Sequence, residues 1–202
     1  AHMGRPHLIL SRCAVAVSAP AELSLTAEID DQIWEIYGPH YSALEYRVQG
    51  DVILCLGQVQ NGRDRVAVAR RCALTGCARS RQPLAHGLRD SFRLEPGQRA
   101  VLTSVSAVYT TKDCADPRAA ALAEVQNADY EALLREHSAN WEKIWSVGAV
   151  ELEGDDEARE ALNYSLYHLN AIAPRHRDDL SVPARGLSGQ TYKGAVFWDS
   201  EM

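Results

Sequence analysis

The sequence predicts an antiparallel β-sandwich followed by a helical region. Up to about residue 110 apolar residues alternate with polar ones, which is typical of half-buried strands, and after it they recur every three or four residues, as in helices. The charge changes at the same place. Residues 1–110 carry 12 Lys and Arg against 10 Asp and Glu, whereas residues 111–202 carry 9 against 17. Both patterns place a boundary near residue 110.

The composition restricts the classes of partner. A chain of 202 residues with 46% hydrophobic residues is long enough for one large domain, or for one domain and part of another. It contains no apolar run of eighteen residues, so we expect no membrane partner. The formal net charge of −6 argues against nucleic acid, because a phosphate backbone binds basic surfaces.

Five cysteines lie at positions 13, 55, 72, 77 and 114. This odd number, behind polar first residues that do not resemble a secretory signal, favours free thiols and a cytoplasmic location. Cys72 and Cys77 have no second pair at zinc-binding spacing, so we expect no metal.

Several segments justify the strands. Leu23, Leu25 and Ala27 form one alternating stripe, and residues 99–110 form another after the turn at Pro96 and Gly97. Between the apolar runs 52–56 and 66–68 lies Asn61-Gly62, which supplies the positive φ angles of a tight hairpin. We therefore expect these two runs to pair antiparallel in a sandwich.

Three helices are expected after residue 110. The first begins at Asp116-Pro117, since aspartate caps a helix and proline suits its first position. The second carries an apolar and aromatic stripe that ends at Gly148, and a short strand is expected at 147–152. The third begins at the acidic run after Gly154 and ends before Pro174. Its expected buried face comprises Ala158, Ala161, Leu162, Ser165, Leu166, Leu169 and Ile172.

The segment 183–201 is punctuated by glycines and contains Trp198 beside Asp199. A sugar is recognised by an aromatic face for stacking and a carboxylate that accepts hydroxyl hydrogens. The same pair also fits a core tryptophan beside a capping aspartate. The residues alone leave both interpretations open.

This segment resembles a signature of glycoside hydrolase family 65. The matching elements are Ala184-Arg185-Gly186-Leu187-Ser188-Gly189, Tyr192-Lys193-Gly194 and Phe197-Trp198-Asp199-Ser200-Glu201, together with His137, Trp141 and Trp145 on one helix and Gly154-Asp155 before the next. The family includes maltose, kojibiose and trehalose phosphorylases and related α-glucoside hydrolases. The resemblance is strong over residues 130–202 and weaker over the strands.

The resemblance implies a multidomain β + α architecture. It places an N-terminal β-sandwich at 4–112, incomplete at its front, then a helical linker at 113–150. The start of an (α/α)6 catalytic barrel, truncated, follows at 151–202.

The resemblance also implies a function. The chain is expected to belong to an inverting α-glucoside phosphorylase or hydrolase that acts on an α-linked glucose disaccharide or oligosaccharide, and that is a homodimer at full length. Trp198 and Asp199 would contact the glucosyl unit. For Phe197, Tyr192, Arg185 and Lys193 a sugar or phosphate contact competes with a role in holding the loop.

No catalytic residue is expected within the chain, because the family's general-acid glutamate lies further along the barrel; the chain alone is then inactive. No cofactor is implied, although inorganic phosphate is the co-substrate of a phosphorylase.

Ala195 stands where the family usually has histidine, and Gln190-Thr191 where it often has Glu-Gly. The alternative is a non-catalytic carbohydrate-binding or structural module that dimerises.

Overall fold

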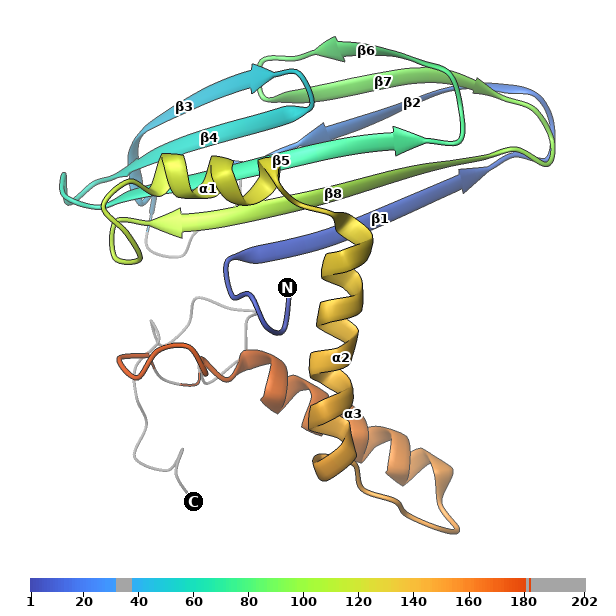
Figure 1. Cartoon of the computed structure of the whole chain (residues 1–202), viewed down its shortest axis with the longest axis vertical. Helices are drawn as coiled ribbons and strands as arrows, with labels where there is room; N and C mark the ends of the chain where they lie inside the picture. Colours follow the sequence, from blue (N-terminus) through green and yellow to red (C-terminus); the bar gives the residue numbers. More distant parts are fainter. Residues whose placement is uncertain (32–37, 181, 183–202) are drawn as a thin grey trace. The chain divides into compact units, whose positions relative to one another are not determined.

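The computed structural model describes residues 1–31, 38–180 and 182 (Figure 1). In this part of the chain eight strands precede three helices. The strands are β1 (Leu8–Ala16), β2 (Ala21–Glu28), β3 (Tyr41–Gln49), β4 (Val52–Val59), β5 (Arg65–Thr75), β6 (Arg79–Pro83), β7 (Gly87–Leu94) and β8 (Arg99–Thr110). The helices are α1 (Pro117–Gln126), α2 (Tyr130–Gly148) and α3 (Asp156–Ile172).

The strands form two antiparallel sheets, which confirms the predicted sandwich. The larger sheet has the order β1-β8-β5-β4-β3, and the smaller has the order β2-β7-β6. β8 pairs with β1 on one side and β5 on the other, so the first and last strands of the sandwich are neighbours. Strand alternation gives each sheet one apolar face toward the other.

The core between the sheets has two clusters. The first joins Ile53 and Cys72 of the large sheet to Ala27 and Leu88 of the small one. The second consists of Leu74, Phe92, Leu94 and Ala100. Because buried apolar area is the main favourable contribution to folding, these clusters hold the sheets face to face.

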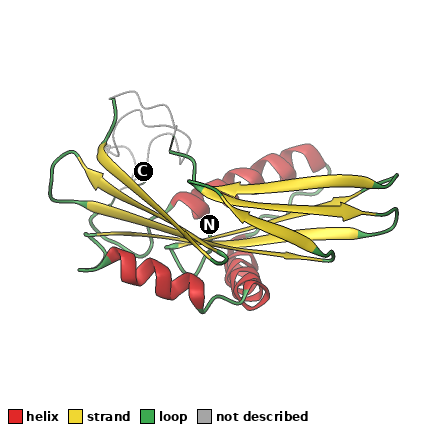
Figure 2. Ribbon diagram, turned by 90° about the horizontal axis from the view of Figure 1, so that it is seen from above, coloured by secondary structure: helices red, strands yellow, loops and turns green. Residues whose placement is uncertain are grey.

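The opposite face of the large sheet is covered by α1, which Figure 2 shows lying along the strands. Small side chains make this contact close: Ala67 and Ala69 of β5, Ala107 of β8 and Ala121 of α1 are each at most 1% exposed. Alanine on both surfaces lets the helix backbone approach the sheet. Val125 fills the remaining space beside these alanines.

The start of α1 is as predicted. The side chain of Asp116 accepts a hydrogen bond from the backbone N–H of Ala119 at 3.0 Å, and Pro117 occupies the first turn. Asp155 caps α3 in the same way, through the N–H of Ala158 at 2.9 Å. Both caps satisfy N–H groups that have no partner inside the helix.

The hairpin between β4 and β5 differs in detail from the prediction. The strands pair antiparallel, as expected, but residues 60–64 make a five-residue loop in place of a tight turn. Asn61 Oδ1 accepts hydrogen bonds from the N–H groups of Arg63 and Asp64, both at 3.0 Å, and Gly62 has a φ of 71°. Asn61 thus stabilises the wider loop by hydrogen bonding to the backbone beyond it.

Two expectations about the helices are wrong. Residues 149–152 form no strand, and Val147 belongs to the last turn of α2. The predicted buried face of α3 is not buried, since none of its described residues is, and Leu169 is 59% exposed. Periodicity identifies an apolar face but cannot say whether another element covers it.

The chain divides into two compact units. The described residues up to Arg135, except Gly38, form the first, and those from Glu136 onward belong to the second. Within the second unit the rings of Trp141 and Tyr167 stack at a centroid distance of 5.0 Å, joining α2 to α3. Trp145 stacks on Trp141 at 5.9 Å. The aromatic stripe of α2 therefore packs helix against helix. The domain limits given above, at 112 and 150, stay predictions.

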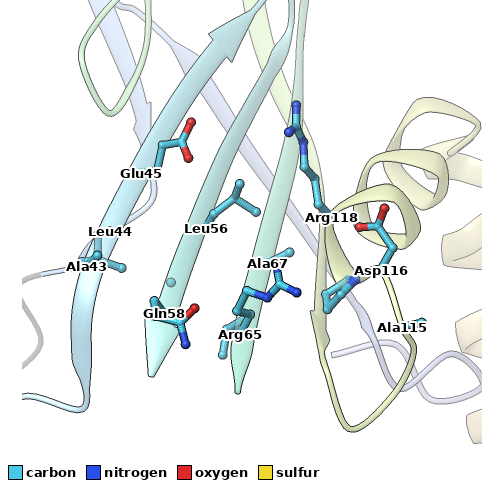
Figure 3. Close-up of a pocket in the computed structure, with 13 residues that line it drawn as sticks. Ala43, Leu44, Glu45, Leu56, Gln58, Arg65, Ala67, Ala115, Asp116 and Arg118 are labelled. Atoms are coloured by element: carbon cyan, nitrogen blue, oxygen red, sulfur yellow. The ribbon is translucent and has the colours of Figure 1, made fainter. Parts of the chain in front are cut away.

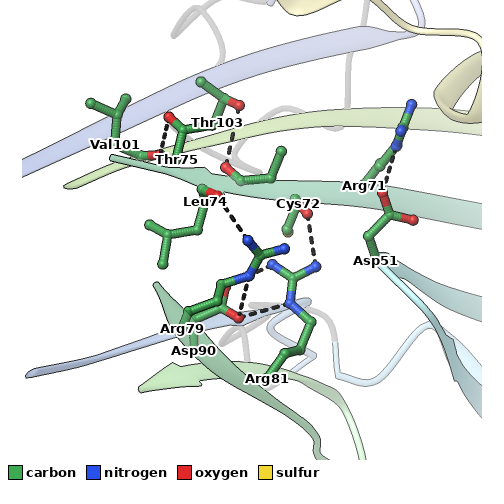
Figure 4. A network of polar contacts seen from close by, with 11 residues as sticks. Asp51, Arg71, Cys72, Leu74, Thr75, Arg79, Arg81, Asp90, Val101 and Thr103 are labelled. Carbon is green, nitrogen blue, oxygen red and sulfur yellow. Dashed lines mark hydrogen bonds and ion pairs between the residues drawn. The ribbon is translucent and has the colours of Figure 1, made fainter. Parts of the chain in front are cut away.

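A buried ion-pair network crosses the sandwich (Figure 4). Asp90 of β7 is 3% exposed and accepts two hydrogen bonds from Arg81 of β6, at 2.7 and 2.8 Å, while Arg79 lies 3.3 Å away. The same arginines donate to carbonyls of β5: Arg81 to Cys72 at 3.1 Å and Arg79 to Leu74 at 3.0 Å. The network thus links β6 and β7 of the small sheet to β5, the central strand of the large sheet.

We expect the substitution Asp90→Ala to lower the free energy of unfolding by about 3 kcal/mol, because it leaves the largely buried Arg81 without its counter-charge. Urea unfolding followed by far-UV circular dichroism measures this. The matched control is Asp51→Ala, which breaks the ion pair between Asp51 and Arg71. Because these two side chains are 41% and 38% exposed, the substitution is expected to lower the free energy of unfolding by less than about 1 kcal/mol. Equal losses in the two variants would contradict the assigned role of Asp90.

Candidate functional site

The residues predicted to contact a sugar lie outside the described residues. This applies to Trp198 and Asp199 and to the additional candidates Phe197, Tyr192, Arg185 and Lys193. Their roles therefore remain predictions. The structure does describe a groove and a smaller recess in the first unit.

The groove has a volume of about 600 Å³ and lies on the α1 side of the large sheet (Figure 3). Three strands form its floor, and the segment that leads into α1 forms a wall. Its lining residues include Leu56 and Ala67 on the floor and Pro117 on the wall. The groove exists because α1 covers β5 and β8 but leaves β3 and β4 open.

The carboxylates and the amide that line the groove already have partners. Glu45 pairs with Arg47 at 2.6 Å, and Asp116 caps α1. The side-chain amide of Gln58 donates to the carbonyl of Asp64 at 3.0 Å. These bonds fix the polar atoms in place and leave no adjacent pair of free carboxyl groups for acid–base catalysis.

Two arginines lining the groove have free guanidinium groups. Arg65 and Arg118 are exposed, and within the described residues neither side chain has an ion-pair partner. Free guanidinium groups donate hydrogen bonds to hydroxyl, carboxylate or phosphate oxygens. The groove therefore offers two cationic hydrogen-bond donors to a polar molecule.

The smaller recess lies at the end of the sandwich where β2 finishes, and Asp31 and His86 help to line it. Tyr46 stacks on His86 with ring centroids 4.1 Å apart. Burial raises the pKa of Tyr46 well above its usual range, and hydrogen bonding with Cys55 and Asp31 raises it further. Tyr46 consequently stays neutral, and its stacked ring and its hydrogen bonds stabilise this end of the sandwich.

The described residues hold no cluster of three or more His, Cys, Asp or Glu side chains that could bind a metal ion. None of the described helices is long and apolar enough to cross a bilayer.

The sequence analysis did not identify the groove residues. Glu45, Gln58, Arg65 and Arg118 are scattered over 74 positions of the chain, and each looks like an ordinary surface residue. Strand alternation could have placed the first three on one sheet face. Only the position of α1 turns that face into a groove.

The family assignment comes from comparison with family models. The N-terminal domain model of glycosyl hydrolase family 65 matches residues 1–144. The chain belongs to glycosyl hydrolase family 65. The model of the central catalytic domain of family 65 matches residues 163–202, so the two matches follow each other in order.

The similar curated proteins agree with this assignment. The chain is 36% identical to nigerose phosphorylase of Lachnoclostridium phytofermentans, over 100% of this chain and 31% of that protein. It is 29% identical to kojibiose phosphorylase of Escherichia coli, over 98% of this chain and 28% of the relative. It is 28% identical to 1,2-alpha-glucosylglycerol phosphorylase of Bacillus selenitireducens, over 98% of this chain and 26% of that protein. The family-65 chain thus spans less than a third of the length of these relatives.

The fold agrees with a solved structure. A human-microbiome protein provisionally named kojibiose phosphorylase superposes with a TM-score of 0.80 at 15% identity, covering 96% of this chain and 27% of that one. Strands followed by helices are therefore the family-65 arrangement, as the sequence predicted.

We expect thiol reagents to distinguish the cysteines. Burial raises the pKa of the Cys55 and Cys72 thiols, which lowers the fraction of reactive thiolate at any given pH. Cys13 is exposed. Limited alkylation of the native protein followed by peptide mass spectrometry should therefore label Cys13 well before Cys55 and Cys72. In denaturant all three should react alike, and equal native rates would contradict the burial described here.

Proposed function

We propose that this chain supplies the sandwich and part of the glucosyl-binding subsite of an inverting α-glucoside phosphorylase. The observation that carries the proposal is the order of the two family matches, N-terminal domain and then catalytic domain, on a chain whose sheets and helices follow the same order. The relatives named above are phosphorylases, which favours phosphorolysis over hydrolysis.

The chemistry follows from inversion at the anomeric carbon. A carboxylic acid protonates the glycosidic oxygen while phosphate attacks the opposite face of the sugar ring. An α-linked glucoside then gives β-glucose 1-phosphate and the free acceptor. Phosphate brings its own negative charge, so a second carboxylate is not needed to activate it. We place the general acid beyond residue 202, and expect the chain alone to be inactive.

Trp198 and Asp199 are proposed to hold the glucosyl unit. A tryptophan ring stacks on the apolar face of glucose, and a neighbouring carboxylate accepts hydrogen bonds from its hydroxyl groups. Phe197, Tyr192, Arg185 and Lys193 are proposed to complete or support this loop.

Ala195 is relevant to specificity. An alanine side chain cannot donate a hydrogen bond to sugar or phosphate, whereas the histidine usual in the family can. Two consequences follow as alternatives: either the linkage and the acceptor differ from those of relatives that keep the histidine, or catalysis itself is altered in this branch.

A second candidate function is binding of a polyhydroxylated or anionic molecule by the sandwich itself. The groove beside α1, with the free side chains of Arg65 and Arg118, favours it. All the residues that line this groove belong to the first unit.

The reaction is tested on the product of the complete reading frame. We expect incubation with nigerose or kojibiose and inorganic phosphate to release β-glucose 1-phosphate, detected by phosphorus and proton NMR. Free glucose in place of the phosphate ester would indicate hydrolysis. No product from a panel of α-linked glucose disaccharides would contradict the proposed function.

The subsite is tested by substitution in the same protein. Trp198→Ala should raise KM for the disaccharide at least about tenfold through lost stacking, and Trp198→Phe should restore much of it. Asp199→Asn should lower kcat/KM about 10- to 100-fold, because hydrogen bonds to a charged group are lost. Unchanged steady-state constants in Trp198→Ala would overturn the assigned role of the ring.

A further inference from the structure

The loop between β4 and β5 carries an asparagine followed by a glycine. Asn61 and Gly62 are both exposed, and a Cβ added at Gly62 would meet no other atom within 4 Å. Because glycine has no Cβ, its backbone nitrogen can approach the preceding side chain closely. The chain already holds this nitrogen next to the Asn61 amide, which favours an intramolecular reaction between them. The loop thus contains the two reacting groups of a deamidation, in contact with water.

The four other asparagines of the chain lack this combination. Each is followed by a residue with a side chain, and each lies within a helix or at its C-terminal end: Asn127, Asn140, Asn163 and Asn170. Within a helix the following N–H group bonds to the preceding turn, so its nitrogen is held away from the side chain. Among the asparagines, Asn61 is therefore the one arranged to react.

The hydrogen bonds of the loop act on both reacting groups. The N–H groups of Arg63 and Asp64 donate to Asn61 Oδ1, both at 3.0 Å. Two donors on this oxygen withdraw electrons from Cγ and stabilise the negative charge that forms on the oxygen when a nucleophile adds. The N–H of Gly62 itself donates to the carbonyl of Val59 at 3.0 Å. Attack therefore begins when this exposed bond opens, and bonds of surface loops open readily.

We propose that Asn61 is a site of spontaneous modification, at which water replaces the side-chain amide through a succinimide. The Gly62 nitrogen loses its proton and attacks Asn61 Cγ. The N–Cγ bond forms, the Cγ–Nδ2 bond breaks, and Nδ2 leaves with that proton as ammonia. Water then opens the ring at Cγ, which gives aspartate, or at the main-chain carbonyl carbon, which gives isoaspartate. No electrons are transferred, and water is the co-reactant.

The modification changes the charge beside Asp64. Asn61 Nδ2 donates to Asp64 Oδ2 at 2.6 Å, and this bond, with a second from Thr111 at 3.1 Å, lowers the pKa of Asp64. Asp64 is therefore ionised at neutral pH, and the aspartate product places a second carboxylate against it. Isoaspartate also lengthens the main chain by one carbon, which moves the acceptor away from the two N–H groups of the loop.

Asp64 connects this loop to the groove beside α1. Its carbonyl accepts hydrogen bonds from the N–H of Val59 at 2.9 Å and from the side chain of Gln58 at 3.0 Å. Thr111, which donates to Asp64, also accepts from the N–H of Arg65 at 3.2 Å. Gln58 and Arg65 both line the groove. Modification of Asn61 thus loosens the bonds that hold one end of the groove.

The site is tested by incubating the intact protein at mildly alkaline pH, followed by tryptic digestion and mass spectrometry. Asn61 is the single asparagine of the tryptic peptide 48–63. This peptide should gain the mass of an amide-to-acid change and separate into aspartate and isoaspartate forms, at least about tenfold faster than the peptides of the helical asparagines. In urea, Gly62→Ala should slow the conversion about tenfold, because a Cβ then hinders the attacking nitrogen. An Asn61 that reacts in urea but keeps its amide in the native protein would overturn the proposal.

The consequence is tested by hydrogen exchange of the loop N–H groups at residues 60–65, corrected for intrinsic rates. Asn61→Asp reproduces one product and should speed exchange about two- to fivefold through like-charge repulsion. Asn61→Asp/Asp64→Asn restores an amide opposite a carboxylate and should return exchange to the wild-type rate. Asp64→Asn, the matched control, keeps a hydrogen-bond acceptor for Asn61 and should differ little from wild type. Unchanged exchange in Asn61→Asp, or no recovery in the double variant, contradicts the assigned role of the Asn61–Asp64 bond.

Discussion

The close contact between α1 and the large sheet is the constraint on which the rest of the first unit depends. Alanines on β5, β8 and α1 bring the helix against the strands, and Val125 seals the contact. Without this cover the strands would expose an apolar face to water, since the small sheet shields only their other side. The same contact directs the chain from the sandwich into α2, whose Leu133 joins the cluster.

This contact also determines which surfaces stay open. Because α1 lies over β5 and β8, the polar residues of β3 and β4 remain accessible and line the groove that begins at the capped N-terminus of α1. The N-terminal segment lies near the C-terminal end of α1: Arg5 pairs with Glu124 at 3.5 Å, and His2 Nε2 lies 2.9 Å from the carbonyl of Leu133. The same segment holds the start of β1, because the N–H and the carbonyl of Leu8 bond to Arg5 and His2.

The two units are stabilised by different interactions. Inside the sandwich the nearly buried carboxylate of Asp90 forms ion pairs with two arginines, which also donate hydrogen bonds to carbonyls of the facing sheet. In the second unit, aromatic stacking joins α2 and α3, while large apolar side chains of α3, including Tyr164 and Leu169, are exposed. The catalytic-domain match begins within α3, at residue 163. An exposed apolar face is reasonable on a helix that starts a larger helical domain.

The sequence by itself determined what local chemistry dictates. Alternation and helical periodicity gave the sandwich followed by helices, Asp116-Pro117 gave the start of α1, and the tail motif indicated family 65. Tertiary structure alone decided the rest. It made the loop at Asn61 wider than a tight turn and kept residues 149–152 out of a sheet. It also left the face of α3 uncovered and assembled the groove from distant residues. Periodicity in the sequence shows which side chains form an apolar face. Contacts between segments distant in the sequence decide which element, if any, covers that face.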